Sequence, residues 1–252
     1  MPKLWPQCRC QAPQPRIGAP KAQGLIAALR PQHNPPCPRS LPTAVPAAGN
    51  VSTGAAAFTA PQLQSRISTS LTDVTGVAVH AFNQRTVAEI FDMIRTLGAL
   101  VGAAERADRL AAELAAEIAH ARRCAAYLTR RPLVYFEEWD EPMISGIAWV
   151  SELIETAGGL DIFADRAGGK SARERIVTTR EVIARQPEIM IGSWCGKKFR
   201  PEKVAARAGF DQIPAVRDGA LYEIKSPIIL QPGPAASTEG LTALEAVMAR
   251  HA

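Results

Sequence analysis

The chain lacks acidic residues over its first 72 positions: the first is Asp73, and all 24 Asp and Glu residues lie from there onward. The same stretch carries seven Lys and Arg residues, so the net charge of +5 is concentrated in it. Residues 73–252 contain the remaining 22 basic residues and all 24 acidic residues, so their net charge is −2. A basic surface typical of nucleic-acid-binding proteins is therefore not predicted, and we expect no nucleic-acid partner.

Long hydrophobic runs are also missing. The chain has no stretch of 18 apolar residues, so no segment is predicted to span a membrane. Lys3 is followed by Trp5 and Pro6 where the apolar core of a secretory signal would run, so no signal peptide is visible.

Cysteine and histidine are too few to indicate a metal site or a disulfide framework. Cys8 and Cys10 do not have a zinc spacing, and Cys124 and Cys195 imply no disulfide. A zinc or manganese site would need several His and carboxylate ligands, and the chain has only four His residues. We expect no metal site.

The first 61 residues are unusually rich in proline, with 12 of the 20, and hold three of the five cysteines. They show no sustained helical or strand period, and two interpretations of residues 1–75 stay open. The first is a disordered Pro/Ala/Gln-rich leader. The second is out-of-frame translation of a GC-rich gene, which would produce Pro, Arg, Ala and Cys but few acids.

Regular patterns begin at Gly76. Residues 77–82 read as a buried strand, and Thr86 with Glu89 forms a capping box that predicts a helix. After a break at Gly102, apolar spacing predicts a second helix over residues 103–129, roughly 40 Å long. That length exceeds what a compact crossover helix needs, so we predict a rigid connector between two lobes.

Residues 131–252 alternate between strand and helix patterns. Strands are predicted at 133–136, 188–192 and 220–224. A helix is predicted at 146–156, with Ser145 as its cap and Gly158-Gly159 as its stop. A second helix follows the capping box Thr178/Glu181, and a third runs from Pro201 to about Gly209. The last predicted helix covers residues 238–252. This alternation predicts a small α/β lobe with a mostly parallel sheet.

Loops that follow these strands carry the candidate binding residues, because the carboxyl ends of parallel strands form the usual ligand site of such sheets. We predict that Trp139 and Trp194 open toward a cleft, where large flat side chains offer contact area to a ligand at low entropic cost. The alternative is that either packs within the lobe, whereas Trp149 and Phe163 are expected in the core. The full set of predicted ligand-binding residues is His80, Glu138, Trp139, Asp140, Ser193, Trp194, Cys195 and Ser226.

The acidic run Glu137–Glu138–Trp139–Asp140–Glu141 allows other interpretations. Its carboxylates could form a catalytic pair, as in glycoside hydrolysis, or a solvated rim, which is the commoner case. Cys195 could be a cobalt ligand or a nucleophile, but an inert thiol is favoured. No nucleotide fingerprint or nucleophile elbow supports an enzyme, so we expect no catalytic residues.

Three segments resemble a known family: FNQRTVAEIFDMIRTLGALVG at 82–102, YFEEWDEPMISGIAWVSELIETAGG at 135–159 and TTREVIARQPEIMIGSWCGKKF at 178–199. They are similar to ABC-importer substrate-binding proteins whose two lobes are joined by one helix, and most similar to the cobalamin (corrinoid) and ferric-siderophore branch. The resemblance covers residues 77–252. Residues 1–76 carry no match to the rest of a first lobe.

The resemblance implies an α/β fold of two lobes joined by one long helix. We therefore expect residues 1–75 to be an aberrant Pro-rich segment and 76–102 a remnant of an incomplete or disordered first lobe. Residues 103–130 would be the interlobe helix, and 131–252 the second lobe, a small mostly parallel sheet with helices on both faces. It further implies a periplasmic, monomeric protein that binds a corrinoid such as vitamin B12 between its lobes, has no other cofactor and delivers its ligand to an ABC permease. One alternative is that the ligand is a ferric siderophore or haem. The other is that the chain is a non-functional truncated remnant.

Overall fold

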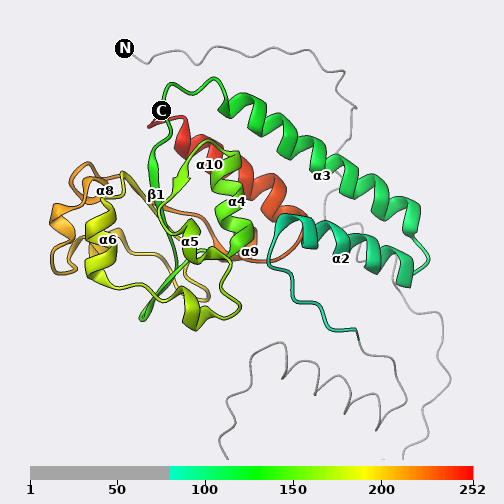
Figure 1. Cartoon of the computed structure of the whole chain (residues 1–252), viewed down its shortest axis with the longest axis horizontal. Coiled ribbons are helices and arrows are strands. Elements are labelled where there is room, and N and C mark those ends of the chain that lie inside the picture. Colours follow the sequence, from blue (N-terminus) through cyan, green and yellow to red (C-terminus); the bar gives the residue numbers. More distant parts are fainter. Residues whose placement is uncertain (1–79, 252) are drawn as a thin grey trace, which may run out of the picture. The chain divides into compact units, whose positions relative to one another are not determined.

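The computed structural model describes residues 80–251 (Figure 1). The predictions for residues 1–75 lie outside the described residues. The predicted strand at 77–82 is wrong in its described part, because residues 80–82 have no regular structure.

Two helices form an antiparallel pair at the start of the described chain (Figure 1). Helix α2 (Val87–Leu100) begins at Thr86, where the predicted capping box with Glu89 is confirmed. Gly102, with φ of +72°, makes the turn into α3 (Ala104–Ala125), which ends earlier than predicted and is about 33 Å long. The two helices approach closely at Gly98, where an added Cβ would lie 2.2 Å from Cβ of Ala107.

The sheet is built around β1 (Leu133–Asp140). Strand β4 (Ile189–Gly192) pairs with it in parallel, and β5 (Leu221–Glu223) extends the sheet beyond β4 in the same direction. On the other edge of β1, β3 (Leu160–Asp161) is parallel and β2 (Met143–Ser145) antiparallel. The predicted α/β class and the mostly parallel sheet are confirmed.

Strand β1 is longer than predicted. Residues 137–140, predicted to form a loop, continue the strand because they pair with β2 across a turn that contains the cis peptide Glu141–Pro142. The predicted Ser145 cap is also wrong: Ser145 ends β2, and α4 (Ala148–Thr156) starts after Ile147 without a side-chain cap. The acidic run is therefore half of a β-hairpin.

Short helices complete the chain. They are α5 (Ala164–Ala167), the 3₁₀ helix η2 (Ala172–Arg175), α6 (Thr179–Arg185), α7 (Pro201–Ala205), the 3₁₀ helix η3 (Phe210–Gln212), α8 (Pro214–Arg217), α9 (Ser226–Ile229), the π-helical turn η4 (Ala236–Gly240) and α10 (Leu241–Met248). The Thr178/Glu181 capping box and Pro201 at a helix start are confirmed. Ser226, predicted in a loop, begins α9 instead.

Two apolar clusters cover the two faces of the sheet, because neighbouring strand residues point to opposite faces. Val134 and Phe136 pack with residues of α3, α4 and α10, which lie together on one face (Figure 1). Tyr135 and Met190 pack on the other face with Phe163 and the segments from α6 to α8. Trp149 and Phe163 are buried, as predicted.

None of the helices in the described part of the chain combines the length and the apolar character that crossing a membrane requires.

Gly192, at the carboxyl end of β4, gives a test of this packing. An added Cβ would lie 2.0 Å from Cδ2 of Phe199, so Gly192→Ala should lower the free energy of unfolding by about 3 kcal/mol, the upper end for overpacking. Gly168→Ala is the matched control, because an added Cβ there meets nothing within 4 Å. Urea unfolding should show a lower midpoint for the first variant only; equal midpoints would contradict the packing.

Candidate functional site

The carboxyl ends of β1, β4 and β5 meet at one edge of the sheet. Glu137 lies opposite Gly192, and Gly192 lies opposite Glu223. The hairpin of β1 and β2 and the loop of residues 193–198 extend beyond this edge. These segments form the carboxyl edge, at which α/β proteins bind ligands.

Glu137 is the buried charge of the carboxyl edge, with no exposed surface. Arg207, which follows α7, binds both carboxylate oxygens at 2.6 and 2.9 Å. The indole of Trp194 donates to Oε1 at 2.9 Å, and the hydroxyl of Tyr135 donates to Oε2 at 3.0 Å. Four donors thus converge on one carboxylate.

Burial and hydrogen bonding oppose each other in this pair. Burial raises the pKa of Glu137 above its ordinary value, although the hydrogen bonds from Arg207, Tyr135 and Trp194 lower it. For Arg207, burial lowers the pKa, but the hydrogen bond and charge of Glu137 outweigh it, so the pKa is raised. Because four donor groups from Arg207, Trp194 and Tyr135 all point at its two oxygens, the contacts of Glu137 are those of an ionised carboxylate.

Glu138 has its own arginine. Arg175, at the end of η2, is buried and donates through Nη1 to Oε2 of Glu138 at 2.5 Å and through Nη2 to Oε1 at 3.3 Å. The same Nη1 donates to the carbonyl of Ser145 at 2.5 Å, and the Ser145 hydroxyl donates to the carbonyl of Arg175 at 3.1 Å. Segment η2 and the hairpin are therefore bonded at four points.

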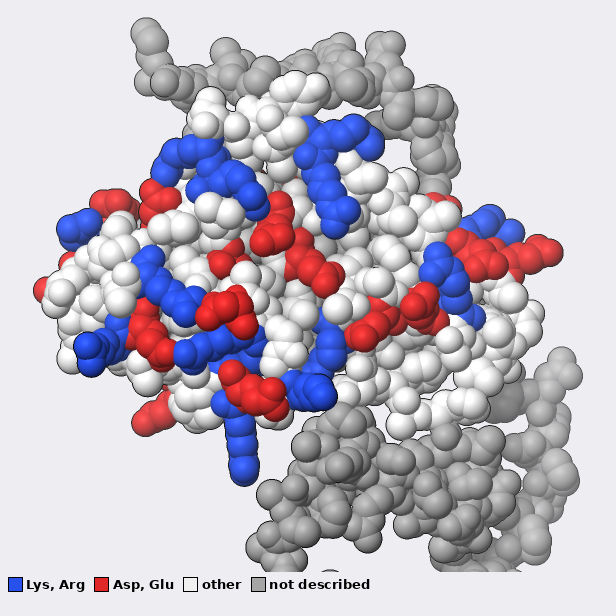
Figure 2. Space-filling view, viewed as in Figure 1, with Lys and Arg blue, Asp and Glu red and all other residues white. Residues whose placement is uncertain are grey.

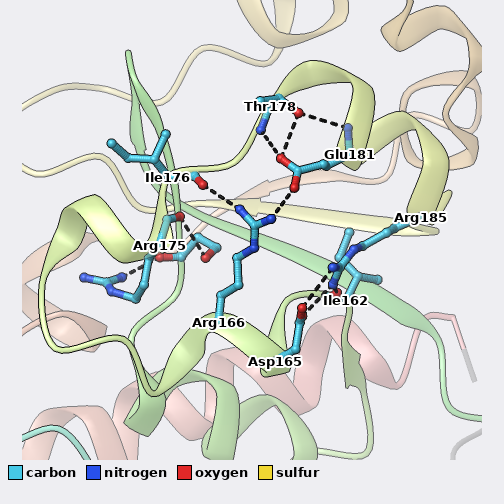
Figure 3. A network of polar contacts seen from close by, with 9 residues as sticks. Ile162, Asp165, Arg166, Arg175, Ile176, Thr178, Glu181 and Arg185 are labelled. Carbon is cyan, nitrogen blue, oxygen red and sulfur yellow. Dashed lines mark hydrogen bonds and ion pairs between the residues drawn. The ribbon is translucent and has the colours of Figure 1, made fainter.

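A second polar network holds the segment that carries Arg175 (Figure 3). Arg166 donates to the carbonyl of Ile176 at 2.7 Å and also binds Glu181. Arg185 binds Asp165 at 2.6 and 3.0 Å. Because these side chains come from α5 and α6, the network joins both helices to the residue after Arg175.

The outer end of the hairpin is tied to the loop after β4. The ammonium of Lys197 lies 2.8 Å from Oδ1 of Asp140 and 4.1 Å from the ring centroid of Trp139. The indole of Trp139 donates to the carbonyl of Glu141 at 2.8 Å, which fixes the orientation of its ring. Burial raises the pKa of Asp140, but the hydrogen bond and charge of Lys197 outweigh it, so the pKa is lowered.

The predicted site residues fall into two groups. Glu138, Trp139 and Asp140 lie together on the hairpin, and Lys197 connects them to the loop that carries Cys195, which is exposed. Trp194, predicted to open toward a cleft, is only 4% exposed because its indole binds Glu137 and packs edge-on against Phe199 at 5.0 Å.

The remaining predicted residues lie apart from the hairpin surface. Ser193 is 1% exposed and Ser226 is buried at the start of α9, so neither side chain lies on the open surface. His80 is exposed in the irregular segment before α2. Whether these residues contact a ligand stays a prediction.

Sequence reasoning missed the arginines of the carboxyl edge. Arg175 and Arg207 lie 37 and 70 residues from their carboxylates, and no local pattern links them. The role of Glu137 did have a signal, because the period of two that places Tyr135 inward continues to Glu137.

Basic and acidic side chains lie next to one another on the visible face, without a field of one sign (Figure 2). Within residues 80–251, no group of three or more His, Cys, Asp and Glu side chains is arranged to hold a metal ion.

The buried pair can be tested by Glu137→Gln. The neutral amide leaves Arg207 without its counter-charge, and breaking a buried ion pair costs about 3–5 kcal/mol of unfolding free energy. Glu202→Gln is the control, because the pair of Glu202 with Arg200 is 3.6 Å long and both side chains are exposed. Chemical denaturation of both variants checks this; equal stabilities would show that the Glu137 pair adds nothing.

The family model for periplasmic binding proteins matches residues 63–228. No curated protein matches the chain.

Solved structures show the same fold. A possible iron-binding periplasmic solute-binding protein from Staphylococcus epidermidis is 23% identical, with a TM-score of 0.61 over 73% of this chain and 70% of that chain. The periplasmic vitamin B12 binding protein of Vibrio cholerae is 18% identical, with a TM-score of 0.56 over 74% and 70%. A periplasmic heme-binding protein from Roseiflexus is 25% identical, with a TM-score of 0.58 over 77% and 74%. With the family match over most of its length, the chain belongs to the periplasmic binding protein family, whose members bind solutes and are not enzymes.

Proposed function

We propose that this protein is the substrate-binding component of an ABC importer and that its ligand is a corrinoid such as vitamin B12. The family match supports the first part, and the similarity to the vitamin B12 binding protein of Vibrio cholerae supports the second. The observation that carries the proposal is the half-exposed Trp139, held in place on a rigid hairpin at the carboxyl edge.

The hairpin offers a pre-formed surface for a large flat ligand. The ring of Trp139 is fixed on one side by its bond to Glu141 and covered on another by Lys197. A surface that is already ordered loses little conformational entropy on binding, which favours affinity. A corrin has a broad apolar ring edged with amides, so it can stack on the indole while carboxylates of the hairpin accept hydrogen bonds from the amides.

We assign the predicted ligand-binding residues different roles. Trp139, Asp140 and Cys195 lie at the surface of the carboxyl edge and would touch the ligand directly. Glu138 is partly exposed beside them, although its carboxylate is bound by Arg175. The buried Trp194 and Ser193 would support the loop, and His80 and Ser226 would contribute from their own segments.

The family also suggests the setting in which the protein works. We propose that it is exported, acts as a monomer and delivers its ligand to an ABC permease. In this proposal α3 is the interlobe helix, residues 76–102 belong to a first lobe and residues 131–252 are the second lobe.

Haem and ferric siderophores are the rival ligands. A heme-binding protein from Roseiflexus and an Fe³⁺-hydroxamate transport protein from Saccharomonospora viridis are among the similar structures. These ligands share a broad, partly apolar body with a corrinoid, so only direct titration separates them.

Titration with cyanocobalamin tests the proposal. Trp139 is partly exposed, whereas Trp149 and Trp194 are buried, so among these three tryptophans the quenching of fluorescence should come mainly from Trp139. Loss of the indole in Trp139→Ala should weaken cobalamin binding about tenfold in calorimetry, equal to about 1.4 kcal/mol. Tyr127→Ala is the matched control, because Tyr127 is a 78% exposed aromatic residue outside the carboxyl edge.

The same titration with haemin and a ferric hydroxamate completes the test. A saturable response to either iron compound but not to cyanocobalamin would overturn the corrinoid assignment and leave the importer function standing. No response to any of the three would contradict the importer function as well. Equal weakening by both alanine variants would remove Trp139 from the site.

A further inference from the structure

A cavity of about 210 Å³ lies between α3 and the C-terminal helices, and it shares no residue with the carboxyl edge. Its walls include Glu117 and His120 of α3, Ser237 and Thr238 of η4, and Thr242 and Glu245 of α10. The remaining wall is apolar. Ligand pockets of drug size have about 300–1,000 Å³, so an occupant of this cavity must be small.

Ser237 is an unsatisfied polar group in the wall of the cavity. It is 1% exposed, and its hydroxyl has no hydrogen-bond partner among residues 80–251. A buried hydroxyl without a partner costs about 1–3 kcal/mol, so it is rarely retained without a reason. A polar occupant of the cavity would supply the missing partner.

The helix that carries Ser237 has an irregular turn at this point. Residues Ala236–Gly240 form a π-helical turn directly before the regular α10. Such turns hold a less stable hydrogen-bond pattern than an α-helix and occur often at functional sites. Here the turn brings both Ser237 and Thr238 into the cavity wall.

Acidic groups dominate the charge of the cavity. Burial raises the pKa of Glu245; the electrostatic interaction with His120 lowers it, and the carboxylate of Glu117 raises it further. The imidazole of His120 also contacts Sγ of Cys124 at 3.5 Å. Two carboxylates thus face one imidazole, and their arrangement does not provide the ligand set of a metal site among the described residues.

We propose that this cavity binds a small organic cation with a primary ammonium group. An ammonium has three donors and no acceptor, which matches two carboxylates and the oxygens of the hydroxyl groups. Thr238 already donates its own proton to the carbonyl of Pro234 at 3.0 Å, so its oxygen has only acceptor capacity left. The site is separate from the proposed corrinoid site and does not depend on it.

Occupancy of the cavity has a structural consequence. The walls come from α3 on one side and from η4 and α10 on the other, so a bound cation would connect them. We expect amide hydrogen exchange to slow in both wall segments, around residues 117–121 and 237–245, when the cation binds.

The experiment uses the full chain and two probes of equal length, 1,4-diaminobutane and uncharged 1,4-butanediol. Calorimetry at neutral pH and low salt should show saturable binding of the diamine and none of the diol. Glu245→Gln and Ser237→Ala should each weaken diamine binding at least fivefold. Glu105→Gln is the control, because Glu105 lies on the same helix α3 outside the cavity and pairs only loosely with Arg109 at 3.8 Å.

Glu245→Gln is expected to fold, so loss of binding will not reflect loss of structure. Because the pKa of Glu245 is raised in the folded chain, its stabilising contribution is complete below about pH 4.5 and is lost as the pH rises through the raised value. At neutral pH the charged form costs stability, and the neutral amide removes that cost. Thermal unfolding without ligand should therefore show no loss for this variant.

Four results would overturn the proposal. The first is absence of diamine binding, and the second is equal binding of the diol. The third is equal weakening by Glu245→Gln and Glu105→Gln, which would indicate general attraction to an acidic surface. Slowed exchange outside the two wall segments, without slowing inside them, would place the diamine elsewhere.

Discussion

The pairing of Glu137 with Arg207 is the constraint on which the carboxyl edge depends. An ionised carboxylate inside a protein is tolerated only when it is paired and fully hydrogen-bonded, and here four donors meet that condition. Because the indole of Trp194 is one of the donors, the pair also fixes the start of the loop after β4. Lys197, three residues further on, is thereby held within reach of Asp140 and Trp139.

Local sequence signals predicted the parts of the fold that depend on local interactions. The capping boxes at Thr86 and Thr178 each join residues three apart, and the glycine after α4 takes a positive φ, so short motifs were sufficient. The length of β1 was missed because it depends on pairing with β2. The four acidic residues that flank Trp139 in the run Glu137–Glu141 suggested a loop, although the period of two continues through Glu137.

The candidate site could be predicted only in outline. The rule that carboxyl ends of parallel strands meet correctly brought the loop after β4 next to the end of β1. The rule does not predict which side chains remain at the surface. Trp194 is buried because its indole donates a hydrogen bond to the carboxylate of Glu137, 57 residues away. The arginine partners of Glu137 and Glu138 come from short helical segments, whose positions depend on the packing of the whole lobe.

These pairings change the meaning of the acidic run. The sequence alone suggests a catalytic carboxylate pair or a solvated rim. In the structure, however, Glu137, Glu138 and Asp140 each form an ion pair with a basic side chain. A group committed to such a bond is poorly placed to act as a general acid or base, and its charge is largely balanced. What remains at the surface is a nearly neutral hairpin with an oriented indole. In the proposed function, this indole would supply the contact area for the ring of the corrinoid.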